Sequence, residues 1–128
     1  MNLLLDTHVL LWVALAPTRL SSLARAALAD TANTLWVSPI SVWEIGNKAS
    51  RGKLVLNFPL PAFLDLSRRD LRYRDLALTH AHALACADLP AFHRDPADRL
   101  LVAQAQVERM AIVSADSAIR QYPVEVLW

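Results

Sequence analysis

The chain has 128 residues, of which 55% are hydrophobic, and its formal net charge is +1 at pH 7. This length and hydrophobic content predict one domain over residues 1–128 with a sizeable core, and they exclude an intrinsically disordered chain. The near-neutral charge gives no sign of a strongly basic nucleic-acid-binding protein. Apart from Lys48 and Lys53 the cations are all arginines, whose planar guanidinium suits phosphate but is equally common on solvated surfaces.

The composition also constrains where the protein works. Cys86 is the only cysteine, which excludes an intramolecular disulfide framework and predicts a reducing, cytoplasmic location. The first leucines have no preceding Lys or Arg and are interrupted by Asp6, so we expect no signal peptide. No apolar run approaches the roughly 20 residues that a membrane helix needs, so we expect no membrane partner.

In chain order, the first half predicts two short buried strands, each followed by helices. The apolar run 2–5 ends on a carboxylate, Asp6, and a charge directly after three leucines is costly to bury without compensation. Ser38 followed by Pro39 is a good helix start, and Gly52 suits the left-handed position after a helix. The expected elements are a strand at 2–5, helices over 7–16 and from about 22 to 32, a strand at 34–37 and a helix from 39 to about 51.

The second half continues the alternation. One long amphipathic helix begins at Asp95-Pro96, and the residues at helical spacing along it are Leu100, Leu101, Gln104, Val107 and Met110. The other expected elements are a helix from 61 to about 69, a weak strand at 74–78, a helix from 80 to 87, a strand at 111–114, a short helix from 116 and a strand at 124–127. Strands that alternate with helices predict an α/β fold, in which a mostly parallel sheet of about five strands is covered by helices on both faces.

Four carboxylates occupy related places in this pattern. Asp6 follows the first strand, Glu44 lies in the helix after the second, Asp98 lies in the first turn of the long helix, and Asp116 follows the fourth strand. In such a sheet all four lie at one edge, where carboxylates repel one another unless a cation is bound. Oxygen ligands without cysteine favour Mg²⁺ or Mn²⁺ over zinc.

Each of these acids also has a purely structural interpretation. Asp6 and Asp116 each stand where they can cap the helix that follows. Asp95 is a good N-cap, and for Asp98 a capping role competes with metal binding. Glu44 is either a surface glutamate or, among apolar neighbours, partly buried. The argument for a metal site therefore rests on the recurrence of all four positions.

Several segments together resemble PIN domains, and more narrowly the VapC-type toxins of bacterial toxin–antitoxin pairs. The segments that carry the resemblance are Leu4-Leu-Asp6-Thr-His-Val-Leu-Leu-Trp12, Ser41-Val-Trp-Glu44-Ile, His93-Arg-Asp-Pro-Ala-Asp98-Arg-Leu-Leu-Val-Ala-Gln-Ala105 and Val113-Ser-Ala-Asp116. The resemblance implies a three-layer PIN-like fold and a metal-dependent endoribonuclease. It also implies a cognate antitoxin protein, a homodimer and an RNA substrate.

The same resemblance assigns roles to the acids. Asp6 and Asp98 are expected to bind the metal directly, Asp116 directly or through water, and Glu44 as ligand or base. Ser114 corresponds to a Thr or Ser of the family that supports this site. The chain has Gly46 and Ala97 where relatives commonly have Ala and Phe, departures that leave every carboxylate in place.

Substrate contacts are less specific. His93, Arg94 and Arg99 flank Asp98 and are candidates for contacting phosphate, although Arg99 is equally suited to an ion pair with Asp95. The basic run of Arg68, Arg69, Arg72 and Arg74 is expected to be a solvated helix face. His8 is expected to pack or cap, and Trp12, Trp36 and Trp43 to belong to the core or an interface, with base stacking by one of them as the alternative.

Other interpretations compete with the toxin. A receiver domain requires an acidic pair after the first strand and a lysine after the last, and a haloacid dehalogenase-type phosphatase requires Asp-x-Asp, so both are excluded by Asp6-Thr7-His8 and by the position of the lysines. A PIN-fold nuclease of RNA processing without an antitoxin stays open, as does a catalytically silent module that binds RNA or protein.

Overall fold

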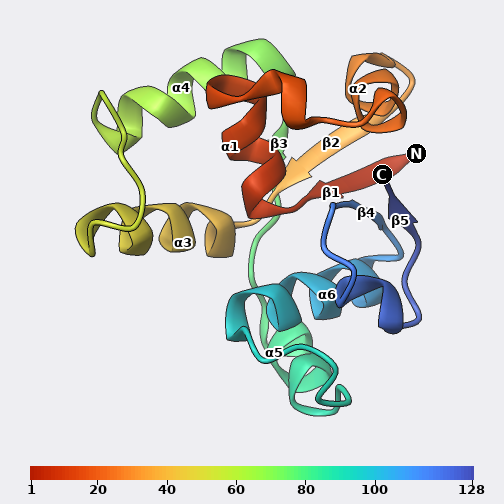
Figure 1. The fold of residues 1–128 in the computed structure, drawn as a ribbon. Helices are drawn as coiled ribbons and strands as arrows, with labels where there is room; N and C mark the ends of the chain where they lie inside the picture. The colour runs from red at the N-terminus through yellow and green to blue at the C-terminus, as the bar shows by residue number, and fades with distance from the viewer.

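The computed structural model describes residues 1–128, and its centre is one five-stranded sheet (Figure 1). The strands are β1 (Asn2–Leu5), β2 (Thr34–Val37), β3 (Arg74–Asp75), β4 (Ala111–Val113) and β5 (Val126–Leu127). Their spatial order is β3-β2-β1-β4-β5, and every neighbouring pair is parallel. The predicted α/β fold with a parallel sheet of five strands is confirmed.

Helices cover both faces of this sheet. Their bounds are α1 (Thr7–Leu15), η1 (Pro17–Arg19), α2 (Ser22–Ala29), α3 (Pro39–Ser50), α4 (Leu60–Leu71), α5 (His80–Ala87), α6 (Pro96–Glu108) and η2 (Ile119–Gln121), where η marks a 3-10 helix. In Figure 1, α1, α2 and α4 lie on one side of the sheet, α5 and α6 lie on the other, and α3 extends beyond the carboxyl ends of the strands. No helix is both long enough and apolar enough to cross a membrane.

The alternation of side chains along the strands divides the core into two clusters. Leu3 and Leu5 of β1 belong to the cluster under α1, α2 and α4, whereas Leu4 belongs to the cluster under α6. β4 follows the same rule, because Val113 joins the first cluster and Ile112 the second. Both faces of β1 are therefore apolar and buried, as expected of a central strand in a parallel sheet.

Several local signals act as predicted. The Ser38 side chain caps α3 by accepting from the Ile40 N–H, and Pro39 occupies the first turn. Gly52 has φ +70°, the left-handed conformation expected after this helix. Gly46 lies inside α3, where an added Cβ would stand 3.2 Å from Leu60 Cδ2, so its small size lets the start of α4 approach closely.

Two predicted boundaries in the first part of the chain are wrong. The second helix ends at Ala29 instead of near residue 32, because Asp30 adopts an extended conformation and its carboxylate accepts from the Ala32 N–H. The third strand is only Arg74–Asp75, not 74–78. Its pairing with β2 ends where the Leu76 N–H donates to the Val37 carbonyl, the last residue of that strand.

The second half differs in similar ways. α6 ends at Glu108 because Arg109 takes a left-handed conformation at φ 56°, so Met110 lies beyond the helix. Its buried side contains Leu101 and Val102, while Val107 is 40% exposed. The predicted helix from 116 is only the 3-10 helix η2, and β5 starts at residue 126, two residues later than expected.

Candidate functional site

The sheet places its topological switch point beside β1. The chain proceeds from β1 outward to β2 and β3, then returns to the other side of β1 for β4 and β5. The carboxyl ends of β1 and β4 are joined by a hydrogen bond from the Asp6 N–H to the Val113 carbonyl, 3.1 Å long. Ligands of open α/β sheets bind at such a point, and both strands continue there into acidic segments.

Asp6 is held at this point by donors on three sides. Its carboxylate accepts from the Thr7 N–H at 2.7 Å and from Ser114 Oγ at 2.6 Å, and the residue is 1% exposed. His8 Nδ1 lies 3.3 Å from Asp6 Oδ2, the oxygen that accepts from Ser114. Asp6 therefore does act as the helix cap that was one of its two interpretations: one carboxylate oxygen caps α1, and the other faces Ser114.

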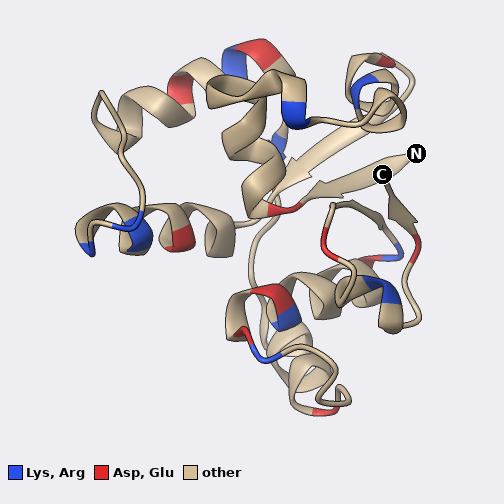
Figure 2. Cartoon of the chain, in the orientation of Figure 1, with Lys and Arg blue, Asp and Glu red and all other residues tan.

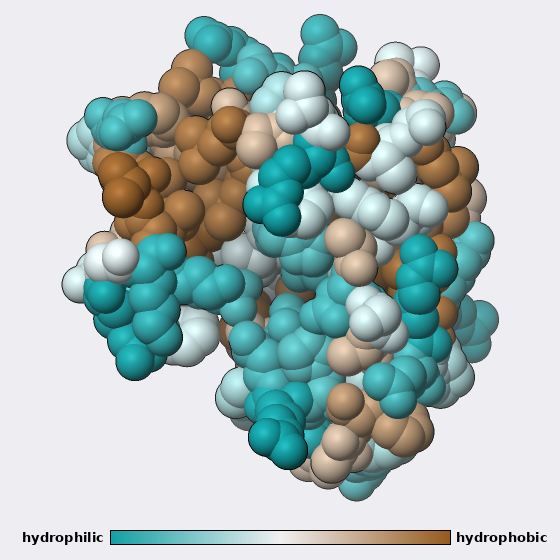
Figure 3. Space-filling model, in the orientation of Figure 1, coloured by the Kyte–Doolittle hydropathy of each residue, from teal (hydrophilic) through white to brown (hydrophobic).

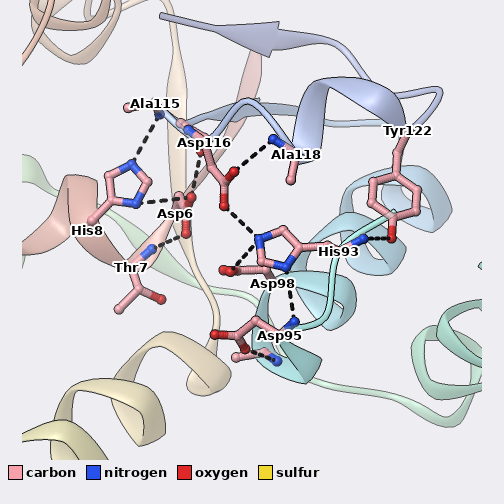
Figure 4. A network of polar contacts seen from close by, with 12 residues as sticks. Asp6, Thr7, His8, His93, Asp95, Asp98, Ala115, Asp116, Ala118 and Tyr122 are labelled. Carbon is pink, nitrogen blue, oxygen red and sulfur yellow. Dashed lines mark hydrogen bonds and ion pairs between the residues drawn. The ribbon is translucent and has the colours of Figure 1, made fainter. Parts of the chain in front are cut away.

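His8 behaves as the structural residue that we expected. Its Nε2 accepts from the Ala115 N–H at 3.1 Å, which leaves the proton on Nδ1 to face Asp6 (Figure 4). The ring also packs on Trp12, with centroids 4.6 Å apart. His8 therefore fixes the loop after β4 relative to β1, and its ring nitrogens are both engaged.

A second group of acids meets around His93. His93 Nε2 lies 2.7 Å from Asp116 Oδ2 and 3.0 Å from Asp98 Oδ2, so one ring nitrogen stands between two carboxylates (Figure 4). Ligand atoms of these three residues all lie within 4.8 Å of one another, a spacing that suits a metal ion. His93 was expected to contact substrate, but the structure places it within the acidic cluster.

His93 is itself firmly positioned. Its Nδ1 accepts from the Asp95 N–H at 3.0 Å, and its own backbone N–H donates to Tyr122 Oη at 2.9 Å. Tyr122 in turn donates to the Pro90 carbonyl at 2.8 Å. Sequence reasoning missed the role of Tyr122, since no local pattern links it to a loop about thirty residues earlier.

The electrostatics of the site reflect the crowding of acids. Burial and the charges of Asp6, Asp95 and Glu44 raise the pKa of Asp98 to about 8, against a smaller opposing effect of His93. Without a cation, Asp98 therefore retains a proton at neutral pH.

The pKa values of His93 and Asp116 are shifted in opposite directions. Burial lowers the pKa of His93, but the hydrogen bond to Asp116 and the charges of Asp98, Asp116 and Asp95 outweigh it, so the pKa is raised. Burial raises the pKa of Asp116, but its hydrogen bonds with His93 and the Ala118 N–H outweigh it, so the pKa is lowered. The imidazole thus compensates part of the negative charge.

Glu44 reaches the same site from α3. It is 6% exposed, so it is not a surface glutamate, and its charge is one of those that raise the pKa of Asp98. The Thr7 hydroxyl donates to Ser41 Oγ at 3.0 Å, a buried contact that fixes the start of α1 against α3. Ser41 lies one helical turn before Glu44, so this contact helps to position the glutamate.

Ser114 connects the two acidic groups. Besides donating to Asp6, its hydroxyl accepts from the Asp116 N–H at 3.0 Å, and the residue is fully buried. The carboxylates at this sheet edge, of which Asp6 and Glu44 are buried and Asp98 and Asp116 half-buried, make a donor set that fits a divalent cation with a preference for oxygen. The residues present therefore fit Mg²⁺ or Mn²⁺.

The basic residues near Asp98 divide into two kinds. Arg99 is half-buried, donates from Nη2 to the carbonyls of Cys86 and Leu89 at 3.2 and 3.1 Å, and forms no ion pair with Asp95. Arg94 is exposed and lines a cleft of about 470 Å³ together with Glu44.

The basic run lies away from this site, on α4 and β3. Arg68 pairs with Asp75 at 2.7 Å, and Arg69 lies 3.9 Å from Asp70. Arg72 is the left-handed residue that ends α4, and Arg74 stacks over Trp36. This agrees with the expected solvated surface.

The sequence matches a known protein family and a characterised relative. Residues 3–125 match the PIN domain family. The chain is 32% identical over 122 residues to ribonuclease VapC22 of Mycobacterium tuberculosis, an alignment that covers 94% of this chain and 92% of that protein. The resemblance inferred from the motifs is therefore confirmed.

Solved structures agree on the fold. The chain superposes on a chain of VapBC2 from Rickettsia felis, a complex bound to a promoter DNA fragment, with a TM-score of 0.76 and 16% identity over 98% of this chain and 97% of that one. For FitAcB from Neisseria gonorrhoeae the TM-score is 0.60 and the identity 20%, over 97% and 95% of the two chains. At these identities the likeness concerns the fold alone. With the family match over almost its whole length, the chain belongs to the PIN domain family.

Proposed function

We propose that this chain, a single PIN domain over residues 1–128, is a metal-dependent endoribonuclease and the toxin of a toxin–antitoxin pair. The observation that carries the proposal is the acidic cluster at the switch point, where burial and the neighbouring carboxylates raise the pKa of Asp98 to about 8. Such crowding costs stability unless a cation relieves it. The relative named a ribonuclease, similar over nearly the whole chain, supports RNA as substrate.

In this proposal the acids hold Mg²⁺ or Mn²⁺. Asp6 and Asp98 are the direct ligands, Asp116 binds directly or through water, and Glu44 acts as a further ligand or as a base. Bound by these residues, a divalent cation would supply a water of lowered pKa and would polarise the scissile phosphate. Because water and not the ribose 2′-hydroxyl attacks, the products carry a 5′-phosphate and a 3′-hydroxyl.

The other residues of the site keep these acids in place. Ser114 fixes one oxygen of Asp6 and the backbone of Asp116 through its single hydroxyl. His93 holds the carboxylates of Asp98 and Asp116 on either side of one ring nitrogen. Such preorganisation limits the rearrangement needed when a cation and a phosphate arrive.

The partner proposed for the chain is an antitoxin protein. The structures that share its fold include VapBC2 and FitAcB, which supports an assembly of this kind. A homodimer stays a prediction from the resemblance. Co-expression with the protein encoded by the adjacent gene, followed by co-purification, tests for the antitoxin, and light scattering of the isolated chain tests for the dimer.

The enzymatic proposal is tested with purified protein and total RNA from the host. We expect cleavage with Mg²⁺ or Mn²⁺, no cleavage in EDTA, and at least a 100-fold loss in Asp6→Asn and Asp98→Asn. Sequencing of 5′-phosphate ends identifies the cleaved RNA and the position of the cut. Cleavage that persists both in EDTA and in Asp6→Asn would refute the proposal, and metal binding without any cleavage would favour a silent PIN module.

A further inference from the structure

The acidic cluster opens on one side into a cleft along α3. We call it the α3 cleft and define it by Trp43, Asn47, Lys48, Arg51, Lys53 and Arg94, which line about 470 Å³. Of the four candidate metal ligands Glu44 lines the same space, and Asp95 does so as well, so the cleft adjoins the acidic cluster at Glu44. Figure 2 shows basic residues at the end of α3, in the segment that follows it and in the loop before α6. In Figure 3 hydrophilic surface surrounds a recess between α3 and the lobe formed by α5 and α6.

The cations of this cleft have no acidic partner. None of Lys48, Arg51, Lys53 and Arg94 forms an ion pair within 4.0 Å, in contrast to Arg68 on α4, which pairs with Asp75. Lys48 follows Glu44 by four residues on the same helix, yet the glutamate is buried with the other acids instead of pairing with it. Four cations without a direct ion pair outnumber the two carboxylates that line the same concave surface, and this excess of positive charge favours a polyanion.

Trp43 is the other unusual residue of the α3 cleft. It is 60% exposed and makes no aromatic or cation–π contact, whereas Trp12 packs on His8 and Trp36 donates its indole N–H to Asn2. An indole face left in water beside cations is suited to stacking with a nucleobase. Its exposure rules out the expected place of Trp43 in the core, and the residue faces solvent beside Glu44.

The spacing along α3 links the aromatic residue to the cations. Trp43, Asn47 and Arg51 are four residues apart in turn, so they lie along one face of the helix. They span about 12 Å at 1.5 Å per residue. A strand whose base rests on Trp43 can therefore continue along the helix toward Arg51, with Arg94 at the acidic end.

We infer that the α3 cleft binds single-stranded RNA next to the bond that is cleaved, with one base stacked on Trp43 and the backbone phosphates on Lys48, Arg51 and Lys53. This inference rests on the proposed ribonuclease function and names the form of its substrate. A base must leave the helical stack to lie on an indole, so the cleft selects loops and unpaired segments over duplex RNA. Direct contacts with phosphate make the affinity dependent on salt.

The test measures binding to the intact chain in EDTA, where no cleavage occurs. The probes are a fluorescein-labelled 12-nucleotide RNA of mixed sequence and the same RNA annealed to its complement, both followed by anisotropy. We expect Trp43→Ala to weaken single-strand binding about 5- to 100-fold and duplex binding less than twofold. Trp43→Phe retains an aromatic face and should lie within about threefold of the wild type.

The charged residues are tested by the salt dependence. Lys48→Gln combined with Arg51→Gln should reduce the slope of log affinity against log salt by about 1.4, since each phosphate contact on a single strand contributes about 0.7. The matched controls are Leu84→Ala and Arg69→Gln, which remove an exposed apolar side chain and an exposed charge that do not line the cleft. Both controls should bind as the wild type does.

The outcomes separate this inference from the proposed function. If the wild type cleaves RNA with metal while Trp43→Ala binds the single strand normally, the inference is overturned and the ribonuclease stands. If binding depends on Trp43 but no RNA is ever cleaved, the cleft is an RNA site and the proposed function fails. Equal losses for single strand and duplex, no binding by the wild type, or a Trp43→Ala variant that loses only a protein partner each overturn the inference.

Discussion

Replacing Asp98 by Asn removes the most strongly perturbed charge of the molecule. The pKa of Asp98 is raised from 3.8 to about 8 by burial and by Asp6, Asp95 and Glu44. Between these two pH values the folded chain holds a proton that the unfolded chain has lost. Stability therefore falls as pH rises through this window, by up to about 1.4 kcal/mol for each pH unit.

The magnitude follows from this slope. Over the whole window the cost has an upper limit on the order of 5 kcal/mol. The Asp98 side chain is still 14% exposed, and water reduces the repulsion, so we expect about half of that limit. For a domain of this size 1 kcal/mol moves the melting temperature by roughly 3–5 °C. The metal-free wild type should therefore lose about 2–4 °C per pH unit from pH 5.5 to 8.

The assay is thermal unfolding in EDTA at several pH values, followed by the same scan with Mg²⁺ or Mn²⁺. Asp98→Asn should melt higher than the metal-free wild type at pH 8, show a flatter pH profile, and gain little from metal. Asp70→Asn, which removes a 65% exposed side-chain carboxylate on α4, is the matched control and should follow the wild type. A wild-type melting temperature that is constant or rises with pH, or an Asp98→Asn variant that melts lower at pH 8, would refute the reasoning.

Three further predictions concern the residues that support the site. Ser114→Ala should lower the free energy of unfolding by about 1.5–3 kcal/mol in urea titrations, because the buried Asp6 carboxylate loses its 2.6 Å donor. Ser114→Thr keeps the hydroxyl, so an equal loss of stability in that variant would contradict this account. In thermal melts, His93→Gln should destabilise the metal-free protein more at pH 6 than at pH 9. The reason is that the pKa of His93 is raised, so its stabilising positive charge is lost as pH rises. A larger destabilisation at pH 9 would contradict this prediction. Arg99→Met should lower the free energy of unfolding by about 1–2 kcal/mol, because it removes two hydrogen bonds to backbone carbonyls. The rate of RNA cleavage should stay unchanged. A loss of cleavage at unchanged stability would instead show that Arg99 acts in the active site.

Local sequence was sufficient for the elements and insufficient for several of their ends. The apolar runs and the cap of Ser38 are interactions within a few residues, and the structure has them as predicted. The predicted helix ends near Asp30 and Arg109 were wrong, because each true end is set by the backbone conformation of a single residue that stops the helix. Which residues of α6 are buried depends on the orientation of the helix on the sheet, and the helical period leaves that orientation open.

The same division holds for the candidate site. The sequence by itself determined the number and type of the acids and the edge of the sheet where they gather, because the carboxyl ends of parallel strands meet at one edge. Only the tertiary structure decided that His93 stands between Asp98 and Asp116 and that Ser114 donates to Asp6, a partner 108 residues away in the chain. Such contacts depend on how β1 and β4 pair and on where the loop before α6 lies, and no local pattern specifies these distances.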